Sequence, residues 1–495
     1  MNIILAGFNL DYEAMKEMRT SSRGLENLTP ETISAAYARI SRNPLSVNEL
    51  RKISRNEVEK ARKSNRNIVF DMGHSSIAEH AVFNIDVIGV SRLLVEEIEK
   101  FRLCSYTEKS QRYIRLKDDF VIPGEINKSA IKKTFVETIE DQNRLYRDLY
   151  KALKTYIFKK YADMASDPAN RSTLEGWAKE DARYTISLAT ETQLGMTLNA
   201  RNLELMLRRC AAHPLKEARE YGEKLYKATK NIAPSLVRYT EATGFDSMTG
   251  NALKSKSRDL IEKFAKKENP IATITETDDK VTLYYVTPDA DDKIVASLIH
   301  SSSHISMDQC IAIVSRMNMK EKEDIIKASC RYMKSYDSPL REFENVDLYF
   351  ELTVSASCFA QMKRHRMATI ICQEYDPSLG ITIPPAIREI GMEGRLAEMA
   401  SRTGKIYDRL KSISPEAAPY ILTNAHRKRI SMKVNARELY HIARLREDIH
   451  AQWDIRETAE RMVRLGKKVM PLTLMLATGK DSFDSLYNQC YPEET

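Results

Sequence analysis

The sequence has no long hydrophobic run, no closely spaced pair of cysteines, and only 16 glycines and 16 prolines. No stretch approaches the ~20 apolar residues of a membrane-spanning helix, so we expect no transmembrane segment. The start, MNIILAGFNLDYE, lacks a basic region and soon contains acids, so we expect no signal peptide. The seven cysteines include no CxxC pair, which predicts neither a disulfide framework nor a structural zinc site. We therefore expect a cytoplasmic protein that binds no metal.

The charge is nearly balanced and evenly distributed. The 495 residues include 77 Lys plus Arg and 69 Asp plus Glu, which gives a net charge of +8. A nucleic-acid-binding protein usually gathers its basic residues in a stripe. Here both signs are interspersed, so the balance is as compatible with an anionic small ligand as with RNA. Hydrophobic residues at 42% and charged residues at 29% are typical of a folded globular protein.

A domain boundary is expected near residues 243–275, where Gly, Ser, Lys and Pro separate two periodic regions. We predict a first globular repeat at residues 1–245 and a second at residues 273–495. The intervening residues 246–272 are rich in lysine, which is typical of a solvated linker helix.

Two segments that contain Asn-Ala-Arg indicate that the chain is duplicated. MTLNARNLELM contains Asn199, and MKVNARELYHI contains Asn435. An Ala-x-Tyr tripeptide stands at the same distance before each asparagine, as ARY in the first half and APY in the second. Further upstream, residues 82–100 and 346–364 each alternate like a strand and then become helical. Each repeat therefore reads as a strand, a helix, a loop and a long helix, which predicts an α+β fold.

Three motifs occur in a fixed order across the two halves. In chain order, residues 73–80 read GHSSIAEH, Arg102 is followed by LCSYTEKSQRY, and residues 361–366 read QMKRHR. An isolated Arg-His-Arg is usually a solvated basic face. Together with the two Asn-Ala-Arg helices, however, the ordered set resembles the flavin-dependent thymidylate synthases over most of both halves.

The resemblance implies two tandem copies of an α+β fold with an antiparallel sheet and long helices. It implies FAD as cofactor, dUMP as substrate, and methylenetetrahydrofolate and NADPH as co-substrates. Family members are tetramers, so two duplicated chains would form a homodimer that is a pseudo-tetramer. No nucleic-acid or membrane partner is implied. No cysteine nucleophile is needed, which suits a chain without a Cys-His constellation.

The resemblance also assigns residues to the ligands. In the family, the nucleotide site combines residues from neighbouring subunits. The residues assigned to dUMP are Glu108, Ser110, Arg112, Arg183, Gln361, Arg364 and Arg446. The residues assigned to FAD are His74, Ser76, Glu79, Arg364, His365, Arg366, Asn435, Arg437, His441 and His450. The expected catalytic residues are Ser110, Arg183, Arg446 and His74. Arginine suits a phosphate dianion because guanidinium donates charge-assisted, bidentate hydrogen bonds.

The two repeats have lost complementary parts of this set. The first repeat has Glu97 and Lys100 where the second keeps Gln361 and Arg364. The second repeat replaces the other part with Cys372, Glu374, Asp376 and Pro419. Two acids beside a phosphate would repel it. We therefore predict one live and one inactive nucleotide site per pair of repeats, with the live site built from both repeats.

Two other hypotheses remain. The departures KFR and DSPLREF from the family pattern are compatible with a catalytically degenerate relative that binds flavin or nucleotide as a sensor or scaffold. The net charge alone motivates an RNA-binding protein, which would bind RNA with a steep salt dependence. Individual residues also have plainer interpretations, since His80 is typical of a helix cap and the Arg446 to His450 region of a polar helix face.

Overall fold

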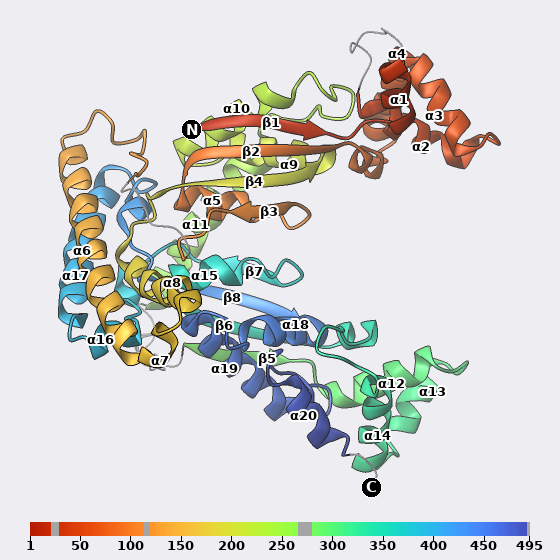
Figure 1. The fold of residues 1–495 in the computed structure, drawn as a ribbon. Helices are drawn as coiled ribbons and strands as arrows, with labels where there is room; N and C mark the ends of the chain where they lie inside the picture. The colour runs from red at the N-terminus through yellow and green to blue at the C-terminus, as the bar shows by residue number, and fades with distance from the viewer. Residues whose placement is uncertain (21–28, 113–118, 266–279, 493–495) are drawn as a thin grey trace. The chain divides into compact units, whose positions relative to one another are not determined.

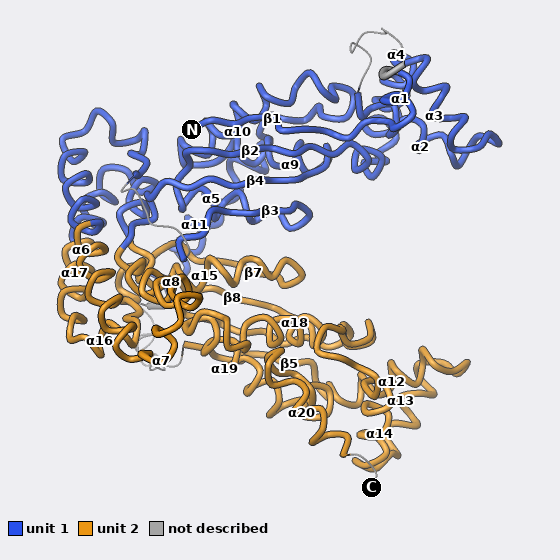
Figure 2. The backbone as a smooth tube through the Cα atoms, viewed as in Figure 1, with its two compact units in different colours: residues 1–143, 186–274, 405–422 blue, residues 144–185, 275–404, 423–495 orange. Residues whose placement is uncertain are grey.

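The computed structural model describes residues 1–20, 29–112, 119–265 and 280–492. The last part of the expected linker, residues 266–272, and the first residues of the expected second repeat, 273–279, lie outside the described residues. The chain forms two compact units (Figure 2). Unit 1 contains residues 1–143, 186–274 and 405–422, and unit 2 contains residues 144–185, 275–404 and 423–495.

Unit 1 is built on a four-stranded antiparallel sheet in the order β1-β2-β4-β3 (Figure 1). Its strands are β1 (Asn2–Phe8), β2 (Val82–Ser91), β3 (Ser105–Glu108) and β4 (Glu191–Asn199). Every second residue of β4 is buried, because side chains alternate between the two faces of a strand. The amphipathic helices α9 (Ala200–Ala211) and α10 (Lys216–Thr229) pack together, and α10 also packs on β1. The sheet and these helices form the core of the unit.

A helical cluster lies at one end of β1 and β2 in unit 1 (Figure 1). It contains α1 (Tyr12–Thr20), α2 (Glu31–Arg39), α3 (Val47–Asn56), α4 (Val58–Arg66) and the short helical turns η2 (Ile40–Arg42), η3 (Asn67–Asp71) and η4 (Ser75–His80). The unit also contains α5 (Arg92–Ile98), α11 (Gly244–Ala265) and η10 (Ala418–Ile421). As expected for the linker, α11 is helical and mostly exposed.

Unit 2 repeats the sheet with the order β5-β6-β8-β7. Its strands are β5 (Val281–Val286), β6 (Asp347–Ser355), β7 (Thr369–Cys372) and β8 (Arg427–Asn435). The remaining elements are α7 (Ala162–Ala165), η5 (Pro168–Asn170), α8 (Arg171–Ala182), η6 (Arg183–Thr185), α12 (Ala290–Ser301), α13 (Met307–Val314), α14 (Met319–Cys330), η8 (Arg341–Asn345), α15 (Ala356–Met362), η9 (Pro377–Leu379), α16 (Pro385–Glu389), α18 (Ala436–Arg446), α19 (Trp453–Val469) and α20 (Phe483–Cys490). The fold is therefore α+β, with two copies of one sheet, as predicted.

The strand pairing corrects the alignment of the two repeats by one residue. Val82 pairs with Asn199 in unit 1, whereas Asp347, not Val346, pairs with Asn435 in unit 2. The extra residue of β2 is a bulge at Gly89, whose φ is 72°. A bulge inserts one residue into one strand only. Sequence spacing alone could not reveal this bulge, because the segments that were compared, residues 82–100 and 346–364, have the same length.

Each unit contains a segment of the other repeat. Residues 144–185 of the first repeat belong to unit 2, and residues 405–422 of the second belong to unit 1 (Figure 2). The exchange occurs within two long helices, α6 (Ile131–Lys160) and α17 (Glu393–Ile413). In unit 1, the amides of Leu188 and Ala189 donate to the carbonyls of Leu422 (2.7 Å) and Tyr420 (3.0 Å). The sequence did not predict this exchange.

Within the described ranges, no helix is long and apolar enough to cross a membrane. The same residues contain no cluster of His, Cys, Asp and Glu that could hold a metal ion.

Candidate functional site

A turn from the first repeat is fixed inside unit 2. This turn, η6, carries Arg183 and Tyr184, both buried. The Arg183 carbonyl accepts a hydrogen bond from Asn424 Nδ2 (3.0 Å), and the Tyr184 carbonyl accepts one from the Ala425 amide (3.0 Å). Both donors belong to the second repeat. Arg183, which the sequence assigned to the nucleotide, is therefore held among residues of the other repeat.

The first residues of α19 contact this turn through their side chains. The Tyr184 hydroxyl accepts from Gln452 Nε2 (2.9 Å) and donates to Asp454 Oδ2 (2.9 Å). The indole of Trp453 stacks on the Tyr184 ring at 5.7 Å, with 21° between the planes. Its Nε1 donates to Asp181 Oδ1 (2.8 Å). Three consecutive residues of the second repeat thus fix the orientation of the Arg183 turn.

Gln361 and Arg446 belong to the same hydrogen-bond network. Gln361 Nε2, near the end of α15, donates to Gln452 Oε1 (3.3 Å). Arg446, the last residue of α18, donates from Nη2 to the Gln361 carbonyl (3.4 Å) and from Nε to His365 Nε2 (2.9 Å). The structure therefore links Gln361 and Arg446 of the second repeat, through Gln452 and Tyr184, to the turn that carries Arg183 of the first.

His365, the central residue of Arg-His-Arg, is buried within unit 2. Because its Nε2 accepts from Arg446, the ring is neutral, with its proton on Nδ1, which lies 3.4 Å from Glu438 Oε1. Burial, reinforced by the Arg446 charge, lowers the pKa of His365 to about 3. His441 packs edge-on against the same ring at 5.6 Å. His365 thus orients Arg446, and a direct flavin contact for it stays a prediction.

The end of β3 and the loop after it, which belong to unit 1, contain three further residues assigned to dUMP. The buried Glu108 side chain forms an ion pair with Arg92 and accepts a hydrogen bond from Thr192 (3.3 Å). Ser110 Oγ accepts from the Arg112 amide (3.1 Å). Because Arg92 offsets the charge of Glu108, this acid does not oppose anion binding by the loop.

The sequence did not predict that Arg92 is the partner of Glu108. The second repeat lacks a counterpart of either residue. Strand register places Ala356 at the position of Arg92 and Cys372 at the position of Glu108 in the second repeat. The acid and its base are therefore absent together. A comparison of Glu108 with Cys372 in the sequence could have prompted a search for the partner.

Several residues assigned to FAD have side chains that bond to other groups of the protein. Asn435 caps α18 by accepting the Glu438 amide (2.8 Å). Arg437 donates to the Pro339 carbonyl (2.8 Å) and pairs with Glu344 (3.1 Å). In the first repeat Glu79 pairs with Arg201 (2.5 Å), the counterpart of Arg437. The counterpart of Glu79 in the second repeat is therefore Glu344.

The other residues assigned to FAD lie at the surface of their units. His74 and Ser76 are exposed in unit 1, and Arg364, Arg366 and His450 are exposed in unit 2. The two arginines flank the buried His365, so two cationic groups stand close together. These two arginines of unit 2 fit a phosphate-bearing cofactor, because a guanidinium donates charge-assisted hydrogen bonds to phosphate.

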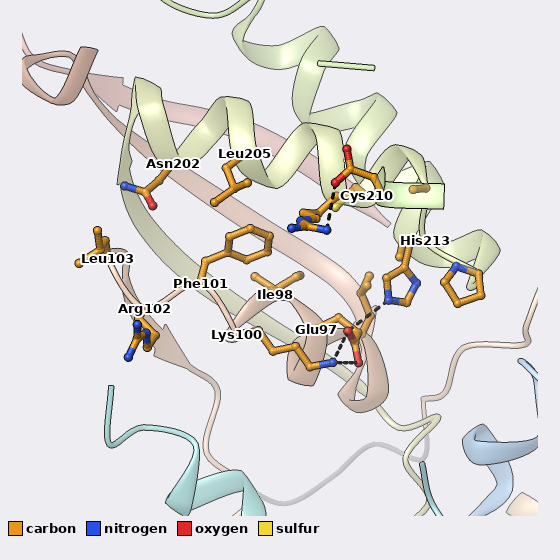
Figure 3. A pocket seen from close by; sticks show the side chains of 16 residues that line it. Glu97, Ile98, Lys100, Phe101, Arg102, Leu103, Asn202, Leu205, Cys210 and His213 are labelled. Atoms are coloured by element: carbon orange, nitrogen blue, oxygen red, sulfur yellow. Dashed lines mark hydrogen bonds and ion pairs between the residues drawn. The ribbon is translucent and has the colours of Figure 1, made fainter. Parts of the chain in front are cut away.

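Unit 1 contains a cavity of about 560 Å³ at the positions that correspond to the unit 2 network (Figure 3). Glu97 stands at the position of Gln361, and Figure 3 shows Lys100 and His213 pointing at its carboxylate (2.6 and 3.1 Å). Burial opposes ionisation of Glu97, but the hydrogen bond from His213 and the Lys100 charge hold its pKa at about 2. An ionised acid lines this cavity where unit 2 has an amide.

Helix register shows what else the cavity has lost. Counted from the capping asparagines Asn199 and Asn435, Leu205 stands in place of His441 and Cys210 in place of Arg446. Arg209, next to this cysteine, pairs with Asp246 of α11 (2.9 Å). The cavity of unit 1 therefore lacks the arginine that unit 2 presents.

A family model described as "Thymidylate synthase complementing protein" matches residues 25–235 and again residues 282–472. The chain belongs to this family. The two matches account for most of the chain and confirm the tandem duplication. A flavin-dependent thymidylate synthase of Clostridium tetani is 33% identical over 215 residues, which are 43% of this chain and 82% of that protein. The match is about as long as one repeat.

A relative of double length also matches. A UPF0159 protein of Chlamydia pneumoniae is 25% identical over 436 residues, 84% of this chain and 80% of that protein. Among solved structures, thymidylate synthase X of Helicobacter pylori, with FAD and dUMP, aligns with a TM-score of 0.32 at 16% identity. The alignment covers 48% of this chain and all of that one.

Proposed function

We propose that the protein is a flavin-dependent thymidylate synthase that methylates dUMP to dTMP with FAD, methylenetetrahydrofolate and NADPH. Membership of the family and the named activity of the Clostridium tetani relative support the reaction. One observation carries the proposal for this chain. The Arg183 turn of the first repeat shares a hydrogen-bond network with Gln361 and Arg446 of the second. This supports a nucleotide site that uses both repeats.

The arginines of unit 2 have distinct proposed roles. Arg364 is exposed and would bind the phosphate through charge-assisted hydrogen bonds. Arg183 and Arg446 are held in place by neighbouring groups and would bind the uracil carbonyls. As C5 of the ring becomes nucleophilic, negative charge grows on these oxygens, and a fixed guanidinium stabilises that charge without reorganising. The catalysis of this step is therefore electrostatic.

The loop of unit 1 is part of the proposal on sequence grounds. Ser110 would donate a neutral hydrogen bond to the phosphate and Arg112 a charged one, while the ion-paired Glu108 shapes the loop. FAD, when bound, supplies the hydride that completes the methyl group. The exposed side chains that would hold it are those of His74, Ser76, Arg364, Arg366 and His450.

Product formation tests the proposal directly. Purified protein with FAD, NADPH, dUMP and methylenetetrahydrofolate should form dTMP under anaerobic conditions. Ser110→Ala and Arg364→Ala should each abolish dUMP binding, because each removes a phosphate contact. Glu374→Ala, in the loop of the inactive set, is the matched control and should retain activity. If the wild-type protein forms no dTMP, the proposed reaction is wrong.

The FAD content separates the enzyme from its alternative. The complementary losses predict about one FAD per chain, and two chains would form a homodimer that is a pseudo-tetramer. The alternative is a degenerate relative that serves as sensor or scaffold, and it is supported by the cavity of unit 1, where Glu97 and Cys210 replace Gln361 and Arg446. It predicts nucleotide or flavin binding without turnover. Release of the flavin and measurement of its absorbance per chain distinguishes one site from two.

A further inference from the structure

The start of α19 differs from the start of α10, its counterpart in the other unit. Gln452, Trp453 and Asp454 begin α19, and Leu215, Lys216 and Glu217 occupy the same positions at α10. Only the carboxylate is common to both. The comparison therefore separates a contact that both units need from contacts that unit 2 alone has.

The shared contact holds the exchanged segment in each unit. In unit 1, Glu217 Oε2 accepts hydrogen bonds from the Tyr420 hydroxyl (2.7 Å) and from Ser91 Oγ (2.6 Å). In unit 2, Asp454 Oδ2 accepts from the Tyr184 hydroxyl (2.9 Å) and from Ser355 Oγ (2.5 Å). Because this Ser–carboxylate–Tyr contact is also present in unit 1, which has Glu97 and Cys210 in place of Gln361 and Arg446, it stabilises the fold and not the substrate.

The contacts that only unit 2 has lead to groups assigned to the nucleotide. Gln452 bridges the Tyr184 hydroxyl and the Gln361 amide. Trp453 donates to Asp181, two residues before Arg183. At the corresponding positions of the second repeat stand Ala417 instead of Asp181 and Pro419 instead of Arg183. The extra contacts and the arginine are therefore present together or absent together.

We propose that Gln452 and Trp453 are positioning residues, which fix the Arg183 turn against Gln361 so that both face the same bound nucleotide. This assignment rests on the proposed function. Gln452 is fully buried and its amide has a partner on each side, so its geometry is narrowly defined. Neither residue touches the substrate in this scheme, and each acts through its neighbour.

Gln452→Leu tests the proposal, because leucine is the residue that unit 1 has at this position. The variant keeps the Asp454–Tyr184 hydrogen bond and removes the bridge to Gln361. We expect the KM for dUMP to rise about tenfold and kcat to fall as well, since the bridge orients groups that bind the nucleotide and stabilise charge on its ring. Trp453→Phe keeps the ring stacking, removes the donor to Asp181, and should give the same pattern.

Tyr420→Phe in unit 1 is the matched control, with Tyr184→Phe in unit 2 as its counterpart. Each loses a buried hydrogen bond to a carboxylate, so each should lower Tm by a similar amount. Only Tyr184→Phe should also raise the KM for dUMP. Equal effects of the two variants on KM, or an unchanged KM in Gln452→Leu, would overturn the proposal.

Hydrogen exchange measures the positioning without any substrate. In Gln452→Leu, the amides of residues 183–185 and of Ala425 should exchange about tenfold faster in the full-length protein. The amides of residues 420–422 of unit 1 should exchange at the wild-type rate. Unchanged exchange at Ala425 would overturn the positioning, even if dTMP forms. Faster exchange in a protein that forms no dTMP would support it and refute only the proposed function.

Discussion

Unit 1 and unit 2 each contain a copy of the same four-stranded sheet and of the same buried tyrosine contact. They differ in the residues around that contact. The tyrosine, its carboxylate and its serine are present in both, because each unit must hold a segment from the other repeat. Around that common contact, unit 2 has Gln452, Trp453 and Arg446, where unit 1 has Leu215, Lys216 and Cys210. The comparison teaches that duplication preserved the fold in both copies, while the proposed nucleotide chemistry required only one copy of each residue.

Breaking the ion pair that unit 1 alone has should give the largest effect. Glu108→Gln removes the strongest charged partner of the buried Arg92 guanidinium and leaves only Glu99 and Glu96 to offset its charge, which costs about 3 kcal/mol of folding free energy. Calorimetry should show a lower Tm. The double variant Arg92→Ala/Glu108→Cys copies the second repeat and should recover a large part of the loss. If Glu108→Gln and the double variant are equally unstable, the coupled loss of the two residues has no electrostatic origin.

Making unit 2 resemble unit 1 at the end of α18 should impair the reaction next. Arg446→Cys introduces the residue found at the Cys210 position and removes a group proposed to stabilise charge on uracil. The expected loss in kcat/KM is at least ~100-fold, which corresponds to about 2.7 kcal/mol. Steady-state kinetics with dUMP as the varied substrate measures it. Cys210→Ser in unit 1 is the control, and a comparable loss there would contradict the assignment of the charge-stabilising role to Arg446.

The third comparison is His365 of unit 2 against Phe101 of unit 1. The pKa of buried His365 is about 3, below its usual value near 6.5, so the unfolded chain takes up a proton in this window and the folded protein does not. The contribution of the buried, neutral His365 side chain to stability is complete above pH 6.5 and is lost as the pH falls toward 3. At pH 5 the loss amounts to about 2 kcal/mol.

His365→Phe should remove this part of the pH dependence. Both tryptophans, Trp177 and Trp453, lie in unit 2, so their fluorescence follows the unfolding of that unit in urea. The difference in unfolding free energy between pH 7 and pH 5 should shrink in the variant. His426, whose burial lowers its pKa to about 4, should leave a residual dependence of the same sign. An unchanged difference would show that His365 is not neutral in the folded protein.

The sequence predicted the duplication, the sheet-and-helix composition and the complementary losses, because these depend on local patterns and on residue identity. The shared Ala-x-Tyr tripeptides were visible in the sequence. They did not predict that Tyr184 of the first repeat lies in unit 2 and that Tyr420 of the second lies in unit 1. An exchange of segments changes which repeat a residue contacts without changing any local pattern. Arg92 and Gln452 were missed for the same reason, since their partners are distant in the sequence.

The one-residue shift in register between β2 and β6 should give the smallest change in stability among these predictions. Gly89 forms the bulge of β2 with φ of 72°, and an added Cβ would lie 3.2 Å from the Met1 nitrogen. β6 pairs with β8 without a register shift, so unit 2 has no counterpart. Gly89→Ala should destabilise unit 1 by about 1–2 kcal/mol through the left-handed backbone conformation. Faster hydrogen exchange in β1 and β2, with β5 and β6 unchanged, would show that the bulge is specific to the first repeat, whereas an unchanged Tm would show that the strand tolerates a regular register there.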